Sequence, residues 1–505
     1  MRFTPILLFL FLLNAANSRG IYVSPTGNDL NKGTHWFLPL RNLQKAANMA
    51  VPGDTVYIMK GDYYSDSEAL IDFDKSGTEK AWIVFKNYRN HQPVLQIKTK
   101  YGIHLRSCNY VSIEGLTIQT QKIYGTETQI SDSVTSAIFL EGSYEIPCTH
   151  IKLYNNFIKD HRGSAVKANY FDYLTLSYNK FYKNALQAAG QATVDLRNGV
   201  FIDDNDRWHS FIQANTFEKN SINDSSLVSS CSPVILLNMA EKAESRYKSK
   251  ILIYNNIMYT NGSGAIWMEN ALGIDIINNS FYKNCENIIC NKPEVQLIAS
   301  EYINFFNNII YASEGKSGIS SLVSKSFQIK NNLQYNCTQT EAGQRNIQAD
   351  PMFEFAKSEH RLFNFRLKGN SPAINAGLDS LLSDTDFEGN PRVVDLHVDL
   401  GAIEFANRLM PSLKGFKTEI PSKGIKSYWS SLYTKDQKVY TVWNEENQAF
   451  YVKVYDFQGN VIRELKNEGN AFEMDFNGFE AGFYTIQVFN EKSSHSDRIE
   501  IKKRP

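Results

Sequence analysis

Residues 251–261 read ILIYNNIMYTN, and residues 274–284 read IDIINNSFYKN. Each segment has two apolar residues two apart, then an Asn, another apolar residue and a second Asn. The first Asn recurs along the chain at Asn155, Asn179, Asn215, Asn256, Asn279, Asn308 and Asn331. The spacings are 24, 36, 41, 23, 29 and 23 residues, so a unit of roughly 23 residues is lengthened chiefly twice.

This repeat predicts a solenoid of short strands, because its apolar residues alternate with a period of two and a helical period of 3.6 is absent. Asn tolerates the left-handed conformation of a tight corner, and stacked amides can hydrogen-bond along a solenoid axis. We therefore expect an all-β parallel β-helix in which the Asn column is structural and has no catalytic role.

Composition and the N-terminus indicate an exported protein. The 505 residues include 53 Lys plus Arg and 53 Asp plus Glu, so no global charge favours nucleic acid or an anionic membrane. Residues 1–18 combine Arg2, an apolar stretch from Ile6 to Leu13 and small residues before a cleavage site, which is the pattern of a signal peptide. No later stretch reaches the length of a transmembrane span. We expect a monomer, either secreted or associated with the outer membrane at the cell surface.

The six cysteines, at positions 108, 148, 231, 285, 290 and 337, show no close pairing of the kind that binds zinc. An exported chain can form disulfides. Disulfides and buried free thiols both remain open.

The N-terminal part carries a family resemblance. Residues 40–50 have apolar side chains at helical spacing, which predicts a short helix that caps the open end of the solenoid. The runs Y-V-S-P-T-G-N-D, L-Q-K-A-A and P-G-D-T-V-Y-I within residues 21–62 resemble the opening of secreted bacterial right-handed parallel β-helix proteins of the pectate-lyase-like superfamily. The resemblance implies this fold for residues 21–405. That superfamily holds lyases, hydrolases, epimerases and binding proteins, so it does not choose an activity.

The C-terminal part resembles two further kinds of segment. Residues 350–405 are similar to the closing region of many bacterial β-helix proteins, and residues 406–426 read as a linker. Residues 427–505 alternate like a small β-sandwich. The runs V-Y-D-F-Q-G-N-V-I and F-E-A-G-F-Y-T-I-Q-V resemble the sorting domain of the type IX secretion system, which implies the secretion machinery as a partner. The usual Tyr-Pro-Asn-Pro opening is missing, so an accessory or carbohydrate-binding β-sandwich is the alternative.

Five segments align as one strand of successive coils: SAIFLEG (136–142), SAVKANY (164–170), GVFIDDN (199–205), PVILLNM (233–239) and GAIWMEN (264–270). Alternation then predicts one inward and two outward columns. The inward column holds Ile138, Val166, Phe201, Ile235 and Ile266. The nearer outward column holds Phe139, Lys167, Ile202, Leu236 and Trp267. The next outward column holds Glu141, Asn169, Asp204, Asn238 and Glu269.

The stretch NGVFIDDNDRWH, residues 198–209, is the predicted floor of a polysaccharide-binding groove. It is crowded with charged side chains, and the two longest insertions, 185–197 and the residues between 221 and 250, flank it. Alternation sends Asp203 inward, where it needs a partner such as Arg197 or Arg207, unless the strand ends there.

Two chemistries fit these columns. A lyase would use Lys167 as the base, Arg207 or Arg197 to stabilise charge, and Asp203, Asp204 and Asp206 as possible Ca²⁺ ligands.

A glycoside hydrolase would instead pair Asp204 with Glu269, or Asp203 with Asp204. The expected substrate contacts in both cases are Trp267, Glu141, Asn169, Asn238, His209 and Arg197. A third class is a glycan-binding surface protein without chemistry. The lyase acting on a uronate-containing glycan is our leading hypothesis.

Overall fold

The computed structural model describes residues 18–405, with gaps at 122–135, 187–190, 201–207, 223–230, 240–250, 288–289, 356–363, 380–384 and 394–396. After residue 428 it describes seven strands. Most of the expected signal peptide and the linker 406–426 lie outside the described residues, as do Asp203, Asp204, Asp206 and Arg207.

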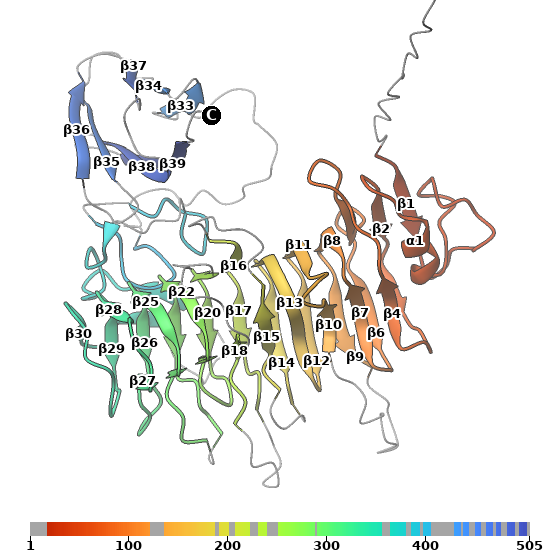
Figure 1. The fold of residues 1–505 in the computed structure, drawn as a ribbon, viewed down its shortest axis with the longest axis horizontal. Coiled ribbons are helices and arrows are strands. Elements are labelled where there is room, and N and C mark those ends of the chain that lie inside the picture. The colour runs from red at the N-terminus through yellow and green to blue at the C-terminus, as the bar shows by residue number, and fades with distance from the viewer. Residues whose placement is uncertain are drawn as a thin grey trace, which may run out of the picture.

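Parallel strands stack into a long β-helix with three faces (Figure 1). The first face contains β4 (Ala69–Phe73), β7 (Tyr101–Arg106), β10 (Ser136–Glu141), the start of β13 (Ser164–Ser177), β15 (Val194–Gly199), β18 (Ile235–Asn238), β21 (Ile266–Glu269), β24 (Val295–Ile298) and β27 (Ile319–Leu322). The second face contains β1 (Gly20–Val23), β2 (Thr55–Ile58), β5 (Ile83–Asn87), β8 (Asn109–Glu114), β11 (Cys148–Tyr154), the end of β13, β16 (Ser210–Gln213), β19 (Ile251–Tyr254), β22 (Leu272–Ile277), β25 (Glu301–Phe306) and β28 (Gln328–Lys330).

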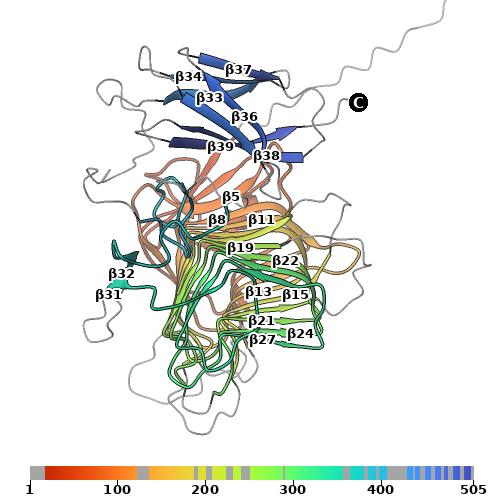
Figure 2. The same cartoon turned by 90° about the vertical axis from the view of Figure 1, so that its left-hand side faces the viewer.

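The third face is a separate sheet of eleven short strands. It contains β3 (Gly61–Tyr63), β6 (Pro93–Ile97), β9 (Thr117–Thr120), β12 (Phe157–His161), β14 (Lys180–Asn184), β17 (Thr216–Glu218), β20 (Ile257–Tyr259), β23 (Ser280–Tyr282), β26 (Ile309–Tyr311), β29 (Leu333–Tyr335) and β30 (Ile347–Gln348). Viewed along the stack, the coils superimpose around one interior (Figure 2). The predicted parallel β-helix is confirmed.

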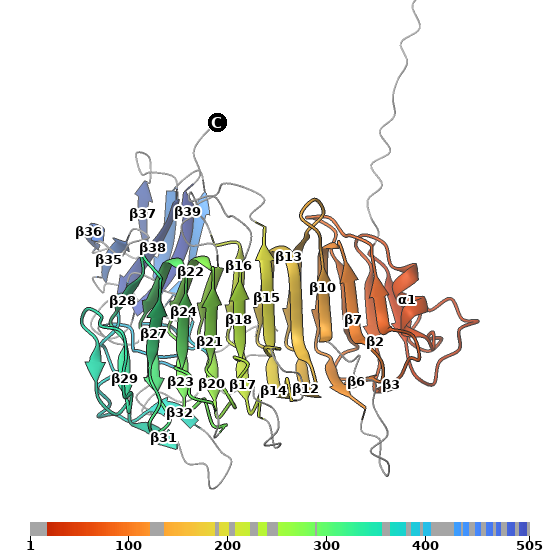
Figure 3. The same cartoon turned by 60° about the horizontal axis from the view of Figure 1, so that its bottom comes forward.

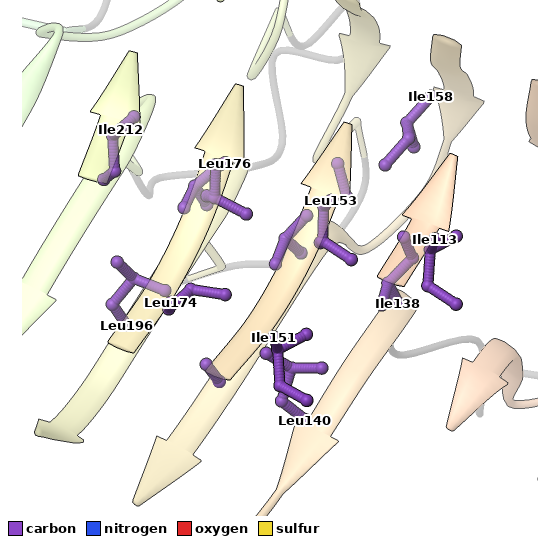
Figure 4. Packing of buried hydrophobic residues seen from close by; sticks show 14 of the residues in the cluster. Ile113, Ile138, Leu140, Ile151, Leu153, Ile158, Leu174, Leu176, Leu196 and Ile212 are labelled. Carbon is purple, nitrogen blue, oxygen red and sulfur yellow. The ribbon is translucent and has the colours of Figure 1, made fainter. Parts of the chain in front are cut away.

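Aliphatic side chains fill that interior in continuous columns, as Figure 4 shows for residues that include Ile138, Leu140, Leu174 and Leu196. Those four side chains are at most 1 % exposed. Burying one such side chain contributes roughly 1.5–3 kcal/mol, and every coil adds several. The coils are therefore held together mainly by this core.

An asparagine ladder lines the corner between the second and third faces. Each ladder residue accepts hydrogen bonds, through its amide oxygen, from the backbone N–H and amide nitrogen of the ladder residue one coil before it. The ladder consists of Asn156, Asn179, Asn215, Asn256, Asn279, Asn308 and Asn332, and ends at Asn346. The predicted structural column is confirmed, but Asn156 and Asn332 replace Asn155 and Asn331.

The difference follows from backbone conformation. The residue before each ladder asparagine has the left-handed φ, for example 53° at Asn155 and 50° at Asn331. At five coils this preceding residue is also Asn, and at four of them its side chain binds the closing region instead of the ladder. Asn255 donates to Thr385, Asn278 to Asp399, Asn307 to Leu378 and Asn331 to Ala376, each at a backbone carbonyl. In these four Asn-Asn pairs, one amide joins the coils and the other holds the closing region.

The closing region packs on the third face. β31 (Phe353–Phe355) and β32 (Asn364–Leu367) lie outside the coils, and Phe353 and Phe365 join a buried cluster with Tyr259 and Tyr282. Arg392 is fully buried and pairs with Glu404 at 2.8 Å.

The N-terminal end is covered by α1 (Leu43–Met49), which buries Leu43, Ala46 and Ala47. Asn42 caps it by accepting a hydrogen bond from the Lys45 N–H at 3.0 Å. The structure therefore confirms the expected capping helix (Figure 1).

The strands after residue 428 form two antiparallel sheets. One contains β33 (Trp429–Lys435), β34 (Lys438–Trp443) and β37 (Ala471–Asp475). The other contains β36 (Val461–Asn467), β35 (Phe450–Tyr455), β38 (Gly482–Phe489) and β39 (Ser494–Ile501). Within the described ranges, no helix is both long enough and apolar enough to cross a membrane.

Candidate functional site

Figure 3 shows the strands of the first face side by side. This face carries the predicted outward columns. Four of the five aligned segments pair in the expected register: Phe139 lies opposite Lys167, Glu141 opposite Asn169, and Asn238 opposite Glu269. Adjacent strands are about 4.8 Å apart, so these outward side chains form one continuous surface.

The middle segment was placed wrongly. The strand between β13 and β18 is β15, so Val194, Asp195 and Arg197 occupy the positions predicted for Phe201, Ile202 and Asp204. Apolar and polar side chains alternate in residues 193–198 as well as in residues 199–205. A pattern of seven residues therefore could not show which of the two segments forms the strand. Hydrogen bonding to both neighbouring strands decides the register.

Asp195 and Arg197 form an ion pair on this corrected strand. Arg197 Nε and Nη2 donate to the two oxygens of Asp195 at 2.7 and 3.2 Å. Asp195 is almost fully buried, whereas Arg197 keeps 40 % of its side chain exposed. The hydrogen bond with Asp195 raises the pKa of Arg197, and the charge of Glu269 adds to this effect. The guanidinium is therefore a permanently charged group, fixed in orientation, on the surface of the first face.

Lys167 lies on the preceding coil, opposite Asp195 in the register. Its Nζ is 5.6 Å from the centre of the Phe139 ring, and among the described residues it makes no ion pair. Lys167 and Arg197 are one coil and two residues apart, about 8 Å between Cα atoms from strand geometry. Both groups can thus contact one sugar unit.

Amide side chains surround the two cations. Asn198 donates to Asn169 at 2.8 Å, and Asn238 donates to Glu269 at 3.1 Å. Beside them the indole N–H of Trp267 is buried and has no hydrogen-bond partner within the described residues. Lys292 Nζ lies 5.0 Å from the Trp267 ring, so this ring is already covered in part.

A further polar cluster extends the first face toward the N-terminus. His104 contacts Glu141 at 2.8 Å and Asp72 at 3.3 Å, and Arg106 donates to Asp72 at 2.9 Å. Of the four residues in this cluster, the aligned segments indicated only Glu141, and they did not include His104, Asp72 or Arg106. YGIHLR (101–106) has the same alternation as SAIFLE one coil later, so extending the alignment by one coil would have found His104 and Arg106.

His209 does not belong to the first face, which corrects its predicted substrate contact. It lies beside the second face with its side chain fully buried, and its Nδ1 is 2.8 and 2.9 Å from the two oxygens of Asp172. Its ring stacks on Tyr173 at 4.3 Å. Trp208 donates to Asp275 at 2.7 Å. These polar residues stabilise the wall of the solenoid and do not reach a substrate on the first face.

The expected calcium ligands Asp203, Asp204 and Asp206 lie outside the described residues, as does Arg207. In the part of the chain that the structure describes, no three His, Cys, Asp or Glu side chains converge as a metal site. Asp195, the described carboxylate nearest to Asp203 in the sequence, forms an ion pair with Arg197.

These features define a parallel β-helix protein with a polar outward face. Residues 21–205 match the family model of the Pel9A-like right-handed β-helix region, and residues 436–502 match that of the secretion system C-terminal sorting domain. The second match indicates export to the cell surface or the medium.

Individual relatives agree over shorter stretches. The chain is 31 % identical over 175 residues to the protein YwoF of Bacillus subtilis (strain 168), covering 32 % of this chain and 34 % of that protein. It is 35 % identical over 88 residues to the pectate lyase PEL9 of Emericella nidulans, covering 17 % and 21 %. The chain thus spans about a third or less of the length of these relatives. The crystal structure of pectate lyase Pel9A aligns at 17 % identity, covering 77 % of this chain and 97 % of that one, with a TM-score of 0.44.

Proposed function

We propose that the protein is a polysaccharide lyase that cleaves a uronate-containing glycan by β-elimination on the first face. The observation that carries this proposal is the juxtaposition of the Lys167 amine and the exposed Arg197 guanidinium on adjacent coils. The Pel9A-like match includes both residues, and one relative is named as a pectate lyase, which supports this class of substrate.

β-Elimination needs a base near the sugar C5 and a cation at its carboxylate. In its neutral form, Lys167 removes the C5 proton α to the carboxyl group, and the electrons form the C4–C5 double bond as the C4–O bond breaks. The departing oxygen takes up a proton from water and becomes a hydroxyl group. Arg197 binds the carboxylate and stabilises the negative charge that builds up on it in the transition state. Asp195 keeps Arg197 in place, since its two hydrogen bonds fix the guanidinium plane.

Calcium remains part of the proposal through Asp203, Asp204 and Asp206. Hard carboxylate oxygens suit this ion. When bound, it would supply further positive charge at the substrate carboxylate. The sorting domain leads us to propose that the type IX machinery exports the protein and leaves it associated with the outer membrane.

The test is to incubate the purified full chain with polygalacturonate and with alginate, with and without Ca²⁺, and to follow ultraviolet absorbance of the unsaturated product. We expect absorbance to rise, and Lys167→Ala to abolish the rise while glycan retention persists. Arg197→Ala should weaken both binding and turnover. Lys180→Ala is the matched control, because Lys180 is an exposed lysine on the third face.

Each other outcome points to a different class of protein. Reducing ends without ultraviolet gain would show a glycoside hydrolase, and Glu269→Gln should then reduce the rate. Retention on glycan without products would show a binding protein. A Lys167→Ala variant with full lyase activity would refute the assignment of the base.

A further inference from the structure

Three cysteines gather where the chain passes from the third face to the first face. Cys285 follows β23, and Cys290 is five residues later; their sulfur atoms are 3.4 Å apart. Cys231, from an earlier coil, also forms a hydrogen bond with Cys290. Two thiols therefore contact the sulfur of Cys290.

The surroundings of Cys290 favour its thiolate. Hydrogen bonds from the Cys285 and Cys231 thiols lower the pKa of Cys290 to about 6, against the opposing effect of burial, and the charge of Lys316 adds to this. Lys316 also donates to the backbone carbonyl of Cys290, so its ammonium group is held nearby. Ser263 Oγ is 3.4 Å from the sulfur. A thiolate beside a second thiol is the arrangement found at oxidation-sensitive cysteines.

A second pair of cysteines shows that burial alone does not produce this arrangement. Cys108 and Cys148 are both fully buried, as Cys290 is. Their thiols donate to the backbone carbonyls of Phe73 and Leu105, which keeps them protonated. Burial raises the pKa of Cys148 to about 11. These two residues are inert structural thiols and serve as an internal control.

We propose that Cys285 and Cys290 are an oxidation site, at which a peroxide converts the two thiols into a disulfide. The Cys290 thiolate attacks one peroxide oxygen, the O–O bond breaks, and hydroxide leaves and takes up a proton as water. The Cys285 sulfur then attacks the resulting sulfenic acid, its proton leaves with the second oxygen as water, and the S–S bond forms. Two thiols are oxidised and one hydrogen peroxide is reduced to two waters.

The geometry favours Cys285 as the resolving thiol. Its sulfur is already in van der Waals contact with Cys290, and closing to a bond of about 2.05 Å needs a movement of under ~1.5 Å. The two residues are five apart in sequence, so the bond closes only a short segment of the chain. An exported chain has no thiol reductant around it to reverse the step.

The experiment treats the purified, reduced full chain with a small excess of hydrogen peroxide, alkylates the remaining thiols and maps peptides without reduction. We expect Cys285 and Cys290 to be lost from the alkylated pool together and to appear as one linked peptide that has lost two hydrogens. Cys108 and Cys148 should stay alkylated to the level of the untreated protein. In the double variant Cys231→Ser with Cys285→Ser, Cys290 should progress to the sulfinic acid instead, because neither neighbouring thiol remains to resolve the sulfenic acid.

Two results would overturn the proposal. In the first, Cys285 and Cys290 stay as fully alkylated as Cys108 and Cys148 after peroxide. In the second, the linked peptide joins Cys231 to Cys290. The peptide map of the wild-type chain decides both even if a variant fails to fold.

Discussion

Asn279 offers a direct measure of what the asparagine ladder contributes. Its side chain is fully buried and makes hydrogen bonds to the coils on both sides. Its amide oxygen accepts from the Asn256 N–H and from the Asn256 amide, each at 2.9 Å. Its amide nitrogen donates to the Ile253 carbonyl at 2.9 Å and to Asn308 Oδ1 at 3.0 Å. Asn279→Ala removes all of these partners at once.

The cost follows from the groups that are left without a partner. The backbone N–H of Asn256 loses its acceptor in a dry interior, and an unsatisfied buried donor costs roughly 1–3 kcal/mol. The amide nitrogen of Asn256 keeps the backbone carbonyls of Ile212 and Tyr254 as acceptors. We expect about 3 kcal/mol, since the removed side chain also leaves a small cavity.

Urea denaturation followed by circular dichroism measures this loss as a shift of the midpoint. Asn291→Ala is the control, because Asn291 is exposed and should change stability by less than about 0.5 kcal/mol. A loss of under about 1 kcal/mol in Asn279→Ala, comparable with the control, would refute the view that the ladder holds neighbouring coils together.

Three other predictions concern buried or metal-linked charges. Burial raises the pKa of Glu294 to about 8, so the folded state holds this proton more tightly than the unfolded state. The free energy of unfolding should therefore fall by roughly 1.4 kcal/mol per pH unit between pH 5 and 7.5. Glu294→Gln should flatten this slope in denaturation curves, and an unchanged slope would contradict the prediction. Arg392→Met should cost roughly 3–5 kcal/mol because it leaves Glu404 buried without its cation, whereas Arg392→Met with Glu404→Leu should recover most of the loss; equal thermal melts of the single variant and wild type would disprove this. If calcium supports turnover, chelation should abolish ultraviolet gain and added Ca²⁺ should restore it, while activity that resists chelation would exclude a required ion.

The fold was predictable from local patterns because the β-helix repeats one short unit. Each coil buries the same columns, so Ile138, Val166, Ile235 and Ile266 could be aligned without knowledge of the tertiary structure. The capping helix and the structural asparagine column were predictable for the same reason. Only the choice within the Asn-Asn pairs at 155–156 and 331–332 was wrong, since either residue of a pair satisfies the sequence pattern.

The candidate site was predicted in part. Lys167 and Glu269 were placed on the outward first face correctly, because their strands have no competing alignment. The strand between them was misplaced by seven residues at the lengthened coil, so Asp195 was overlooked and Arg197 was assigned to an insertion. His209 lies in a polar-looking stretch, yet its partner Asp172 is 37 residues away and makes it a buried structural residue.

The sequence by itself determined the solenoid, its cap and the outward face, because alternation and a repeated corner are local properties of the chain. Tertiary structure decided which strand fills the lengthened coil, and hence that Asp195 orients Arg197 beside Lys167. It also brought Cys231, Cys285 and Cys290 together. Whether such residues meet depends on which coil each of them occupies. Only the hydrogen-bonded register of the whole stack fixes the coil to which a residue belongs.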